Sequence, residues 1–429
     1  MGASMSIVSE LRALTRTQRS TFFACFLGWT LDAFDFFLLT VCLKAIATDF
    51  HVGIKQVAEA LFWTLAMRPV GAFIFGAMAE KWGRRPTLMI NIVCFSLFEL
   101  GSAFAPTLAS FMVLRALFGV AMGGEWGVGA ALAFETLPAK GRGFFSGILQ
   151  EGYVCGNLLA AAVYGLLFSH LHGTGMFTGW RVMFMIGAAP ALLAFYLRFK
   201  VDESPAWLAA RAEKQGKVAA PFQWSLIWKY MPTFLFLVVL MTAFTSFSHG
   251  TQDLYPTFLE KDKGFSSGTA GFVIVIGSLG ALCGGILCGT LSERFGRKKA
   301  IVTAALLALP MIPLWAWSHG AVAMAAGGFL MQLCVQGAWG VIPAHLNELS
   351  PGPVRAIFPG LTYQLGNLFS SKNGPLQAWL ATRYAGGLFG PVLAGTVVVV
   401  SLAVAALTAS GPEAKGTVMT VDEPDAGAR

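Results

Sequence analysis

A long apolar segment of the chain carries polar side chains at helical spacing. In the stretch FTSFSHGTQDLYPTFL, the residues Thr245, Ser248, His249 and Gln252 share one face of a helix, and Asp253 lies one turn beyond His249. Polar groups on one face of an apolar helix are expected to line a cavity, and histidine exchanges protons near neutral pH. This stripe predicts a binding site.

Carboxylates in two other apolar segments are candidates for carrying a proton. The sequence LDAFDFF places Asp32 and Asp35 on one helical face. Two carboxylates close together in a low dielectric rarely both stay ionised, so one of them is expected to hold a proton. A structural hydrogen-bonding role is the alternative. Glu125, in RALFGVAMGGEWGVG, is expected either to titrate or to pair with a neighbouring helix. Asp253 is a further proton-site candidate.

Arg68 stands alone as a cation in the apolar segment 57–79. It precedes Gly76, near the end of that segment, by about 12 Å of helix, which places it close to the middle of a bilayer. An arginine does not lose its proton and needs an anion. That anion is either Asp32 or Asp35, in a permanent ion pair, or the carboxylate of a ligand, which the guanidinium fork binds well.

Further polar residues recur at helical spacing in three more apolar segments, and hydrogen bonding between helices is the alternative reading for them. Those predicted to bind substrate together with the stripe are Gln150, Tyr153, Tyr363, Gln364 and Asn367. Asn157, Gln332 and Gln336 also fit a central cavity.

These residues are positioned by membrane-spanning helices. The chain of 429 residues is 56% hydrophobic and 12% charged, whereas a soluble domain carries about 25% charged residues. Each apolar run is long enough to cross a bilayer. The twelve predicted spans are 21–43, 57–79, 87–105, 109–134, 145–168, 181–199, 232–258, 268–291, 299–317, 321–345, 357–380 and 386–409. The protein is thus expected to be an all-α polytopic membrane protein.

Basic residues are distributed unevenly between alternate loops. They are concentrated in the two tails and in the even-numbered loops, and Arg68, Arg115 and Lys372 are those assigned to spans. The net charge of +8 therefore reflects membrane orientation and not nucleic-acid binding. The positive-inside rule places the N- and C-termini in the cytoplasm, with the chain in the cell (inner) membrane. No separate targeting segment is expected before the first span.

The chain contains an internal repeat. GAMAEKWGRR begins at Gly76 and GTLSERFGRK begins at Gly289. ETLPAKGR, from Glu135, and ELSPGPVR, from Glu348, are separated by the same number of residues. A shared offset for two motifs indicates a tandem duplication of a six-span unit. The expected domains are 1–199, a cytoplasmic linker 200–231, and 232–429.

The duplicated ten-residue loop motif resembles that of the major facilitator superfamily. The resemblance covers nearly the whole chain and implies two six-helix bundles that rock about a central site. Glycine at position 76 allows close helix packing. A pairing formed in only one state would act as a conformational latch, although the loop charges could simply set topology. The latch candidates are Gly76, Glu80, Arg84, Arg85, Glu293 and Arg297.

The polar stripe itself is similar to the signature of the sialate/lactate proton-symporter branch. That signature reads Asn-x-x-Ser/Thr-His-x-Ser/Thr-Gln-Asp-x-x-x-Thr, and Thr245 stands where the branch has asparagine. LDAFDFF, RALFGVAMGGEWG and SGILQEGYVCGN also resemble the branch, while DESPAWLAAR resembles an element of sugar-porter-like members. The positions that match the signature are Ser248, His249, Thr251, Gln252, Asp253 and Thr257.

The resemblance implies a proton-coupled symporter that imports a small monocarboxylate such as lactate or pyruvate. The alternatives are a symporter of a sialic or aromatic acid or of a sugar, an efflux antiporter, and, in a different class, a membrane sensor or enzyme. No nucleophile–base pair, phosphate loop or metal-ligand spacing among the cysteines supports an enzyme. The expected partners are the acid, protons and the lipid bilayer, with no cofactor, metal or nucleic acid, and the chain is expected to be a monomer.

Overall fold

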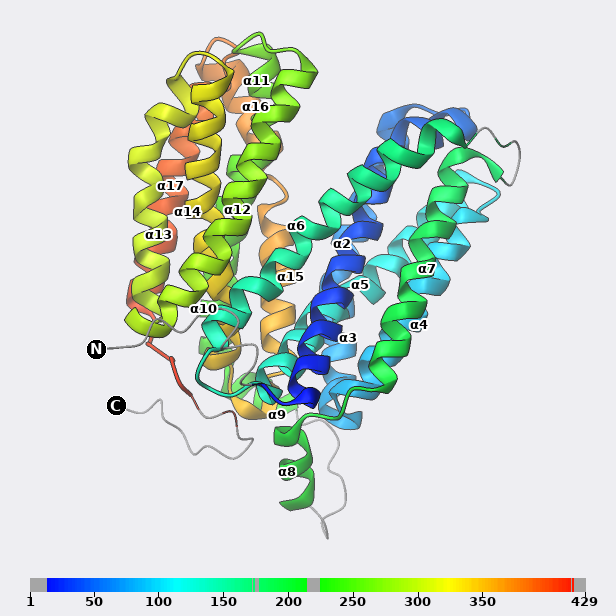
Figure 1. Cartoon of the computed structure of the whole chain (residues 1–429), viewed down its shortest axis with the longest axis vertical. Coiled ribbons are helices and arrows are strands. Elements are labelled where there is room, and N and C mark those ends of the chain that lie inside the picture. Colours follow the sequence, from blue (N-terminus) through cyan, green and yellow to red (C-terminus); the bar gives the residue numbers. More distant parts are fainter. Residues whose placement is uncertain (1–13, 172, 174–176, 214–223, 418, 420–429) are drawn as a thin grey trace.

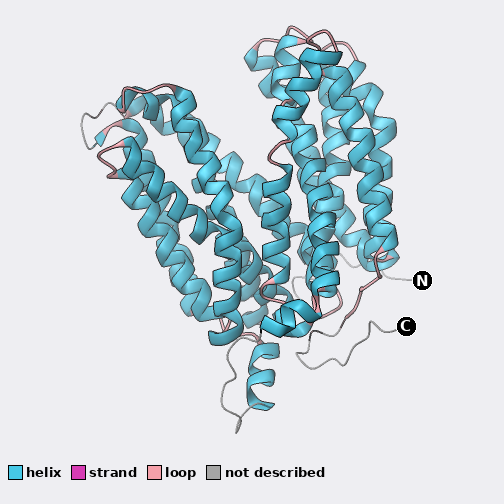
Figure 2. Ribbon diagram, turned by 180° about the vertical axis from the view of Figure 1, so that it is seen from behind, coloured by secondary structure: helices cyan, strands magenta, loops and turns pink. Residues whose placement is uncertain are grey.

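A computed structural model describes residues 14–171, 173, 177–213, 224–417 and 419. Every regular element in these ranges is helical, as Figure 2 shows. The first half comprises six long helices, α2 (Arg16–Asp49), α3 (Ile54–Trp82), α4 (Arg84–Ala103), α5 (Leu108–Thr136), α6 (Arg142–Leu167) and α7 (Gly179–Phe199).

The second half repeats this pattern with interrupted helices. Pro256 and Pro313 accompany two of the interruptions, because proline lacks the amide hydrogen that continues a helix. The elements are α10 (Met231–Gln252) with α11 (Tyr255–Lys261), α12 (Ser267–Phe295), α13 (Arg297–Ile312) with the short π-helical turn η3 (Pro313–Trp317), α14 (Ala321–Leu349), α15 (Phe358–Ser370) with α16 (Asn373–Tyr384), and α17 (Gly390–Ser410).

The twelve predicted spans are therefore confirmed, with boundaries a few residues from those expected. By length and composition, nine of the spans within the described ranges are suited to cross a membrane, and α6, α7 and α15–α16 complete the twelve. Large apolar side chains such as Leu97, Val113 and Val399 are exposed on the outside of the helices. Such an exterior fits lipid and not water. The protein is a multi-pass membrane protein.

The helices form two bundles that touch at one end and diverge at the other (Figure 1). At the touching end, α6 packs on α12 and α14, and α3 and α5 pack on α15. Glycines allow this approach: a Cβ on Gly127 of α5 would lie 2.7 Å from Cα of Gly360 in α15. We call this the contact end and the opposite one the divergent end.

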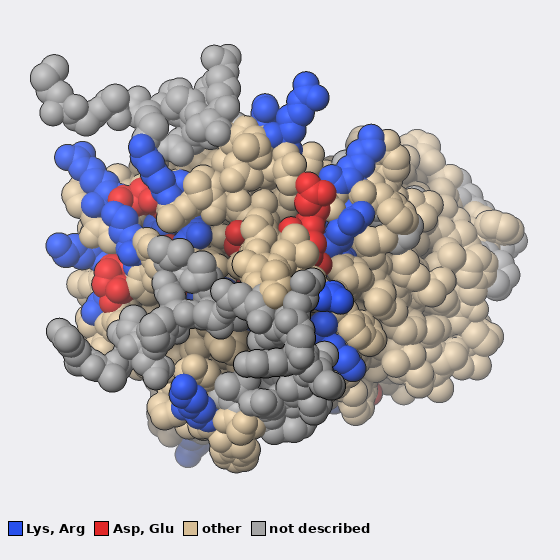
Figure 3. Space-filling view, turned by 90° about the horizontal axis from the view of Figure 1, so that it is seen from below, with Lys and Arg blue, Asp and Glu red and all other residues tan. Residues whose placement is uncertain are grey.

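The contact end carries the connecting elements and many charges. Helix α2 begins there, α17 ends there, and the short helices α8 (Pro205–Glu213) and α9 (Trp224–Lys229) lie between the halves (Figure 1). The Trp207 amide donates to Ser204 Oγ at 3.2 Å, so Ser204 caps α8. Many lysine and arginine side chains lie on this face (Figure 3). Residues 214–223 of the predicted linker lie outside the described residues.

Candidate functional site

A cavity of about 330 Å³ lies between the two bundles. Its walls come from α2, α3 and α6 of the first half and from α10, α11, α12, η3, α14 and α15 of the second. The predicted residues that line it are Arg68, Gln150, Tyr153, Thr245, Ser248, His249, Gln252, Asp253, Tyr363 and Asn367, together with Asn157, Gln332 and Gln336. Spans distant in the sequence thus contribute to one site.

Arg68 reaches the cavity without a carboxylate partner. Its side chain is buried, with Nε and Nη2 lying 3.2 Å and 2.5 Å from Met122 Sδ. Its guanidinium carbon lies 5.1 Å from the centre of the Phe36 ring. No ion pair joins it to Asp32, Asp35 or any other acid of the described residues. A cation desolvated in this way retains the capacity to bind an anion.

The polar stripe of α10 presents a connected set of hydrogen-bonding groups to the cavity. His249 Nδ1 lies 3.1 Å from Asp253 Oδ1, and the two side chains are 37% and 45% exposed. Gln252 donates to Gln332 Oε1 at 2.8 Å, while Ser248 Oγ accepts from Gln336 at 3.3 Å. The imidazole and carboxylate thus remain partly accessible to a ligand, and the glutamines are positioned by one another.

One predicted substrate residue lies off the cavity. Gln364 is buried and is absent from the lining, although its Oε1 accepts a hydrogen bond from Asn367 at 3.3 Å. The prediction of direct contact is wrong for this arrangement of the bundles. Tyr363 and Asn367, on the adjoining face of α15, line the cavity instead.

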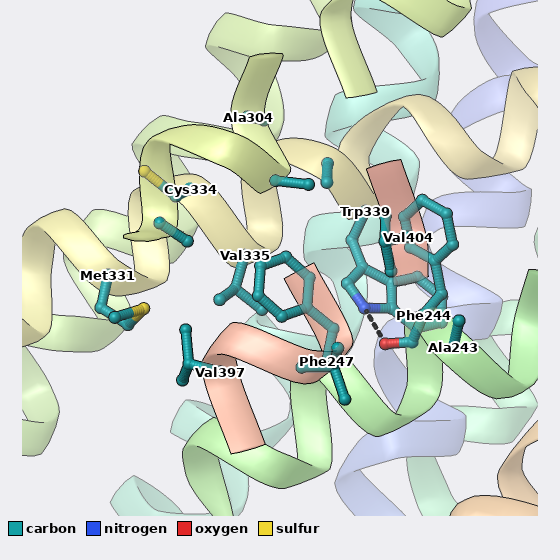
Figure 4. Close-up of a cluster of buried hydrophobic side chains, with 14 of the residues drawn as sticks. Ala243, Phe244, Phe247, Ala304, Met331, Cys334, Val335, Trp339, Val397 and Val404 are labelled. Carbon is teal, nitrogen blue, oxygen red and sulfur yellow. Dashed lines mark hydrogen bonds between the residues drawn. The ribbon is translucent and has the colours of Figure 1, made fainter. Parts of the chain in front are cut away.

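Aromatic rings from both halves meet beside the cavity. Trp29 lies 5.7 Å from Tyr153 and 6.4 Å from Trp126, while Tyr363 lies 4.7 Å from Trp126 and 5.6 Å from Trp339, measured between ring centres. Trp339 is fixed by donating from Nε1 to the Phe244 carbonyl at 3.2 Å (Figure 4). These rings close the space between the bundles.

Sequence reasoning missed this aromatic layer. Tryptophans in apolar spans resemble ordinary core residues. A signal was nevertheless present, because Trp126 and Trp339 are separated by the same offset as the repeated motifs.

Asp32 and Asp35 lie inside the first bundle and not on the cavity. Both are buried, and none of their carboxyl oxygens has a hydrogen-bond partner among the described residues. A Cβ on Gly187 of α7 would lie 2.9 Å from Asp35 Oδ1 and 3.4 Å from Glu99 Oε1. Asp35 therefore faces α7 and the acid of α4. Carboxyls buried without a hydrogen-bond donor are best accommodated as neutral acids.

Two buried ion pairs flank these aspartates. Glu125 Oε1 accepts from Arg198 at 2.8 Å. Of the two roles expected for Glu125, titration or pairing with a neighbouring helix, the structure shows the pairing. Arg115 donates to Glu99 at 2.6 Å, which gives this span cation a structural role. Arg198 was not among the basic residues predicted to lie within spans. The structure shows it buried inside the first bundle and not in a loop.

The repeated loop motifs form the same ionic cluster twice at the contact end. Arg84 pairs with Glu135 at 3.0 Å and with Glu80 at 3.1 Å. Arg297 pairs with Glu348 at 2.9 Å and with Glu293 at 2.8 Å. Each arginine thereby joins its own helix to two neighbouring helices of the same bundle and orients one carboxylate toward the other bundle.

The carboxylates of Glu80 and Glu293 accept hydrogen bonds from the opposite bundle. Glu80 Oε1 accepts from the Ala356 amide at 2.8 Å, and Glu293 Oε1 accepts from the Gly143 amide at 2.5 Å. The two bonds occupy equivalent positions of the repeat. A Cβ on Gly76 would lie 2.9 Å from the Ala356 carbonyl oxygen.

Other members of the motif stay within their own half. Arg85 donates to the Phe199 carbonyl at 3.0 Å in the first half, and no bond from it to the second half is found among the described residues. Two acids that sequence reasoning missed, Glu203 and Glu413, accept from the first amides of α4 and α13. Glu413 comes from the tail after α17, where no motif marks it.

Two helical bundles around a central polar cavity, closed at one end by duplicated charge clusters, have the architecture of a membrane transporter. Comparison with known families matches residues 25–343 and 235–423 to the Major Facilitator Superfamily. The chain belongs to this family of transporters, and it is not an enzyme. The predicted superfamily is confirmed.

Relatives agree with the predicted branch. A carboxylic acid transporter protein homolog of Saccharomyces cerevisiae is 29% identical over 400 residues, which cover 88% of this chain and 64% of the yeast protein, so this chain spans just under two thirds of that relative. The sialic acid transporter NanX of Escherichia coli is 28% identical over 396 residues, covering 91% of this chain and 92% of NanX.

Solved structures agree on the fold. The proton:xylose symporter XylE bound to 6-bromo-6-deoxy-D-glucose superposes with a TM-score of 0.72 at 20% identity, covering 93% of this chain and 97% of XylE.

Proposed function

We propose that this protein is a proton-coupled symporter that imports an organic monocarboxylate, with lactate and pyruvate as the first candidates. The observation that carries the proposal is the guanidinium of Arg68, which lies on the central cavity and forms no ion pair within the described part of the chain. A buried cation without a protein carboxylate is suited to bind the carboxylate of a substrate. His249, on the opposite bundle, faces the same space, and the signature that the polar stripe of α10 resembles favours small acids.

A larger organic acid is the second candidate. A cavity of about 330 Å³ falls within the range that holds drug-sized ligands, and the named relatives include a sialic acid transporter. The aromatic walls offered by Phe36, Phe37 and Tyr153 suit a ligand with an apolar part.

Uptake into proteoliposomes separates these candidates. Labelled lactate, pyruvate, sialic acid, benzoate and xylose are supplied with and without an inward proton gradient. The proposal expects a gradient-driven accumulation of lactate or pyruvate, and accumulation of only the larger acids would select the second candidate. Accumulation of xylose, or export driven by the gradient, would overturn the proposal.

The proton path in this proposal runs through the first bundle. Asp32 and Asp35 are the candidate proton sites, because each is buried without a partner among the described residues. The His249–Asp253 pair on the cavity supplies a second route. Glu125 is the weakest candidate, since Arg198 neutralises it.

The cross-bundle bonds of Glu80 and Glu293 act as the latch of the cycle. They join the bundles only while the contact end is closed, so they stabilise the state whose cavity faces the divergent end. Rocking of the halves would break them and expose the cavity on the other side.

Replacing either latch acid by alanine is expected to shift this balance toward opening of the contact end. Loss of a hydrogen bond to a charged acceptor costs about 1.5–3 kcal/mol, or a factor of about 10 to 150 in the ratio of the two states. Spin labels on Lys55→Cys and Lys261→Cys, at the divergent end, report the ratio as a distance distribution. Asp202→Ala, an exposed change, is the control. Distributions that are the same in Glu80→Ala, Glu293→Ala and the parent would contradict the latch.

The orientation of the protein is also a proposal, in which the contact end faces the cytoplasm. Basic residues favour the cytoplasmic side of a membrane. A cysteine at Lys261 is expected to react in whole cells with a membrane-impermeant thiol reagent, whereas one at Lys299 is expected to react only after lysis. Both positions are exposed. The reverse labelling pattern would invert the orientation.

A further inference from the structure

Glu151 is a buried carboxyl that the proposed proton path does not use. It follows Gln150 on α6, yet it is absent from the cavity lining and only 3% of its surface is exposed. Its side chain points across the boundary between the bundles, where a methyl group on Gly285 of α12 would overlap Glu151 Oε1. It is therefore a carboxyl held between the two halves.

This carboxyl has no hydrogen-bond partner among the residues that the structure describes. Both of its oxygens are buried there without a donor, and none of the ion pairs between described residues includes Glu151. An ionised carboxylate in such a site would lose its hydration without compensation, so the closed interface accommodates it only as the neutral acid. The titratable and charged groups on the helices packed around it are Arg142, Tyr153, Cys155 and Tyr164 on α6, Arg16, Arg19, Cys25, Asp32, Asp35, Cys42, Lys44 and Asp49 on α2, Cys283, Cys288, Glu293 and Arg294 on α12, and Cys334, His345 and Glu348 on α14.

The position of Glu151 ties its proton to the opening of the contact end. One turn closer to that end, Gly147 packs on Gly285. Ser146 Oγ accepts from the Ala344 amide of α14 at 3.0 Å, and the latch bond to Gly143 follows. Glu151 thus lies at the cavity-side edge of the contacts that must separate when the contact end opens. Separation would bring water to the carboxyl.

The second repeat does not share this feature. The equivalent position, at the common offset, is Gln364, which is likewise buried. The first bundle thus carries an ionisable group where the second carries a neutral amide of the same shape, so a response to protons at this site belongs to the α6–α12 boundary alone.

We propose that Glu151 is a proton-binding gate residue. The carboxyl binds a proton from water at the contact end before the α6–α12 boundary closes, and it releases that proton to the same side when the boundary opens. Because Glu151 does not line the cavity and exchanges its proton with the contact end alone, this proton does not cross the membrane and does not add to the number carried with substrate. The inference rests on the alternating access of the proposed function, and it assigns the pH control of closure to one residue.

Proton linkage determines the direction in which pH shifts the equilibrium between the closed and the open contact end. The closed contact end holds one more proton than the open one, so acid favours closure and alkali favours opening. Above the range in which a hydrated carboxyl ionises, near pH 4.3, the ratio of closed to open is expected to fall by up to about tenfold for each pH unit. No substrate is needed for this effect.

The test measures that ratio without substrate. Spin labels on Lys55→Cys and Lys261→Cys, in a background whose seven natural cysteines are replaced, report the distance across the divergent end at pH 5.5, 6.5, 7.5 and 8.5. The parent is expected to shift toward the short distance as the pH rises. Glu151→Gln, which copies the neutral acid, and Glu151→Leu, which removes the polar group, are expected to keep the long distance and to lose most of the shift.

Two further variants complete the design. Glu151→Asp keeps a carboxyl and is expected to retain a pH-dependent distance. Asp202→Asn, an acid-to-amide change at an exposed position, is expected to leave the shift in place. A shift that persists unchanged in both Glu151→Gln and Glu151→Leu would overturn the proposal, as would loss of the shift in Asp202→Asn.

Failure of the proposed function gives a different result. If the parent accumulates none of the tested acids but shows a pH-dependent shift that Glu151→Gln removes, the gate role of Glu151 is supported and the substrate assignment is wrong. If acids accumulate but the pH-dependent shift does not depend on Glu151, the proposed function is supported and the gate role of Glu151 is wrong.

Discussion

Replacing Arg68 by lysine or alanine is expected to weaken the binding of a carboxylate substrate by about 10- to 150-fold. The guanidinium reaches the cavity, forms no ion pair with any described residue, and lies 2.5 Å from Met122 Sδ. Loss of one charge-assisted hydrogen bond costs about 1.5–3 kcal/mol. Lysine keeps the charge but not the planar fork, so the change is not conservative. Binding of labelled acid to the purified protein measures the loss.

A neutral amide analogue of the substrate distinguishes a direct contact from a structural one. The amide is expected to bind poorly to the parent and to lose little more in Arg68→Ala. Arg383→Lys, the same chemical change at an exposed position of α16, is expected to bind the acid as the parent does. If acid and amide weaken alike in Arg68→Ala, Arg68 only supports the fold of the cavity wall, and the proposed contact with the carboxylate is wrong.

The spans were predictable because membrane insertion depends on local composition. Each span is a run of apolar residues whose length a bilayer dictates, and the helix bounds agree within a few residues even where α10 breaks before Pro256. The repeat offset gave the pairing of equivalent motifs, and with it the two symmetrical clusters around Arg84 and Arg297.

Partners of buried charges were not predictable in the same way. A helical stripe indicates which residues share a face, as His249 and Gln252 do on the cavity, but it does not tell which neighbouring helix faces a lone acid. Arg198 lies at the end of a span, where a cation is expected for topology, and its bond to Glu125 depends on the packing of α7 against the bundle. Gln364 and Tyr363 are adjacent, yet only the tyrosine lines the cavity.

The same limit explains why Glu151 escaped notice. Next to Gln150 in the sequence, it reads as one more polar residue of a cavity-facing helix. Its distinct environment arises from Gly285, contributed by the other half of the chain. Close contacts of this kind depend on where two bundles meet, and neither bundle alone specifies that boundary.

Asp32→Asn and Asp35→Asn are each expected to abolish uphill uptake while exchange of substrate survives in at least one of them. A proton gradient of one pH unit can drive about tenfold accumulation for each coupled proton, so a variant that has lost its proton site should stop at equal concentrations inside and outside. Exchange of substrate across the membrane requires only that substrate binds and that the two bundles rock. Asparagine copies the neutral acid in shape, and both carboxyls are buried without partners in the described part of the chain.

The two aspartates differ in their surroundings, which makes their comparison informative. Asp35 lies beside Glu99, the partner of Arg115, whereas Asp32 is one turn from Gly28, against which the Glu125–Arg198 pair packs. Measuring pH-driven accumulation and exchange in the same proteoliposomes, with the exposed Asp202→Asn as control, separates coupling from folding. If both variants still concentrate substrate as the parent does, the coupled proton does not reside in the first bundle, and the His249–Asp253 pair on the cavity becomes its remaining site.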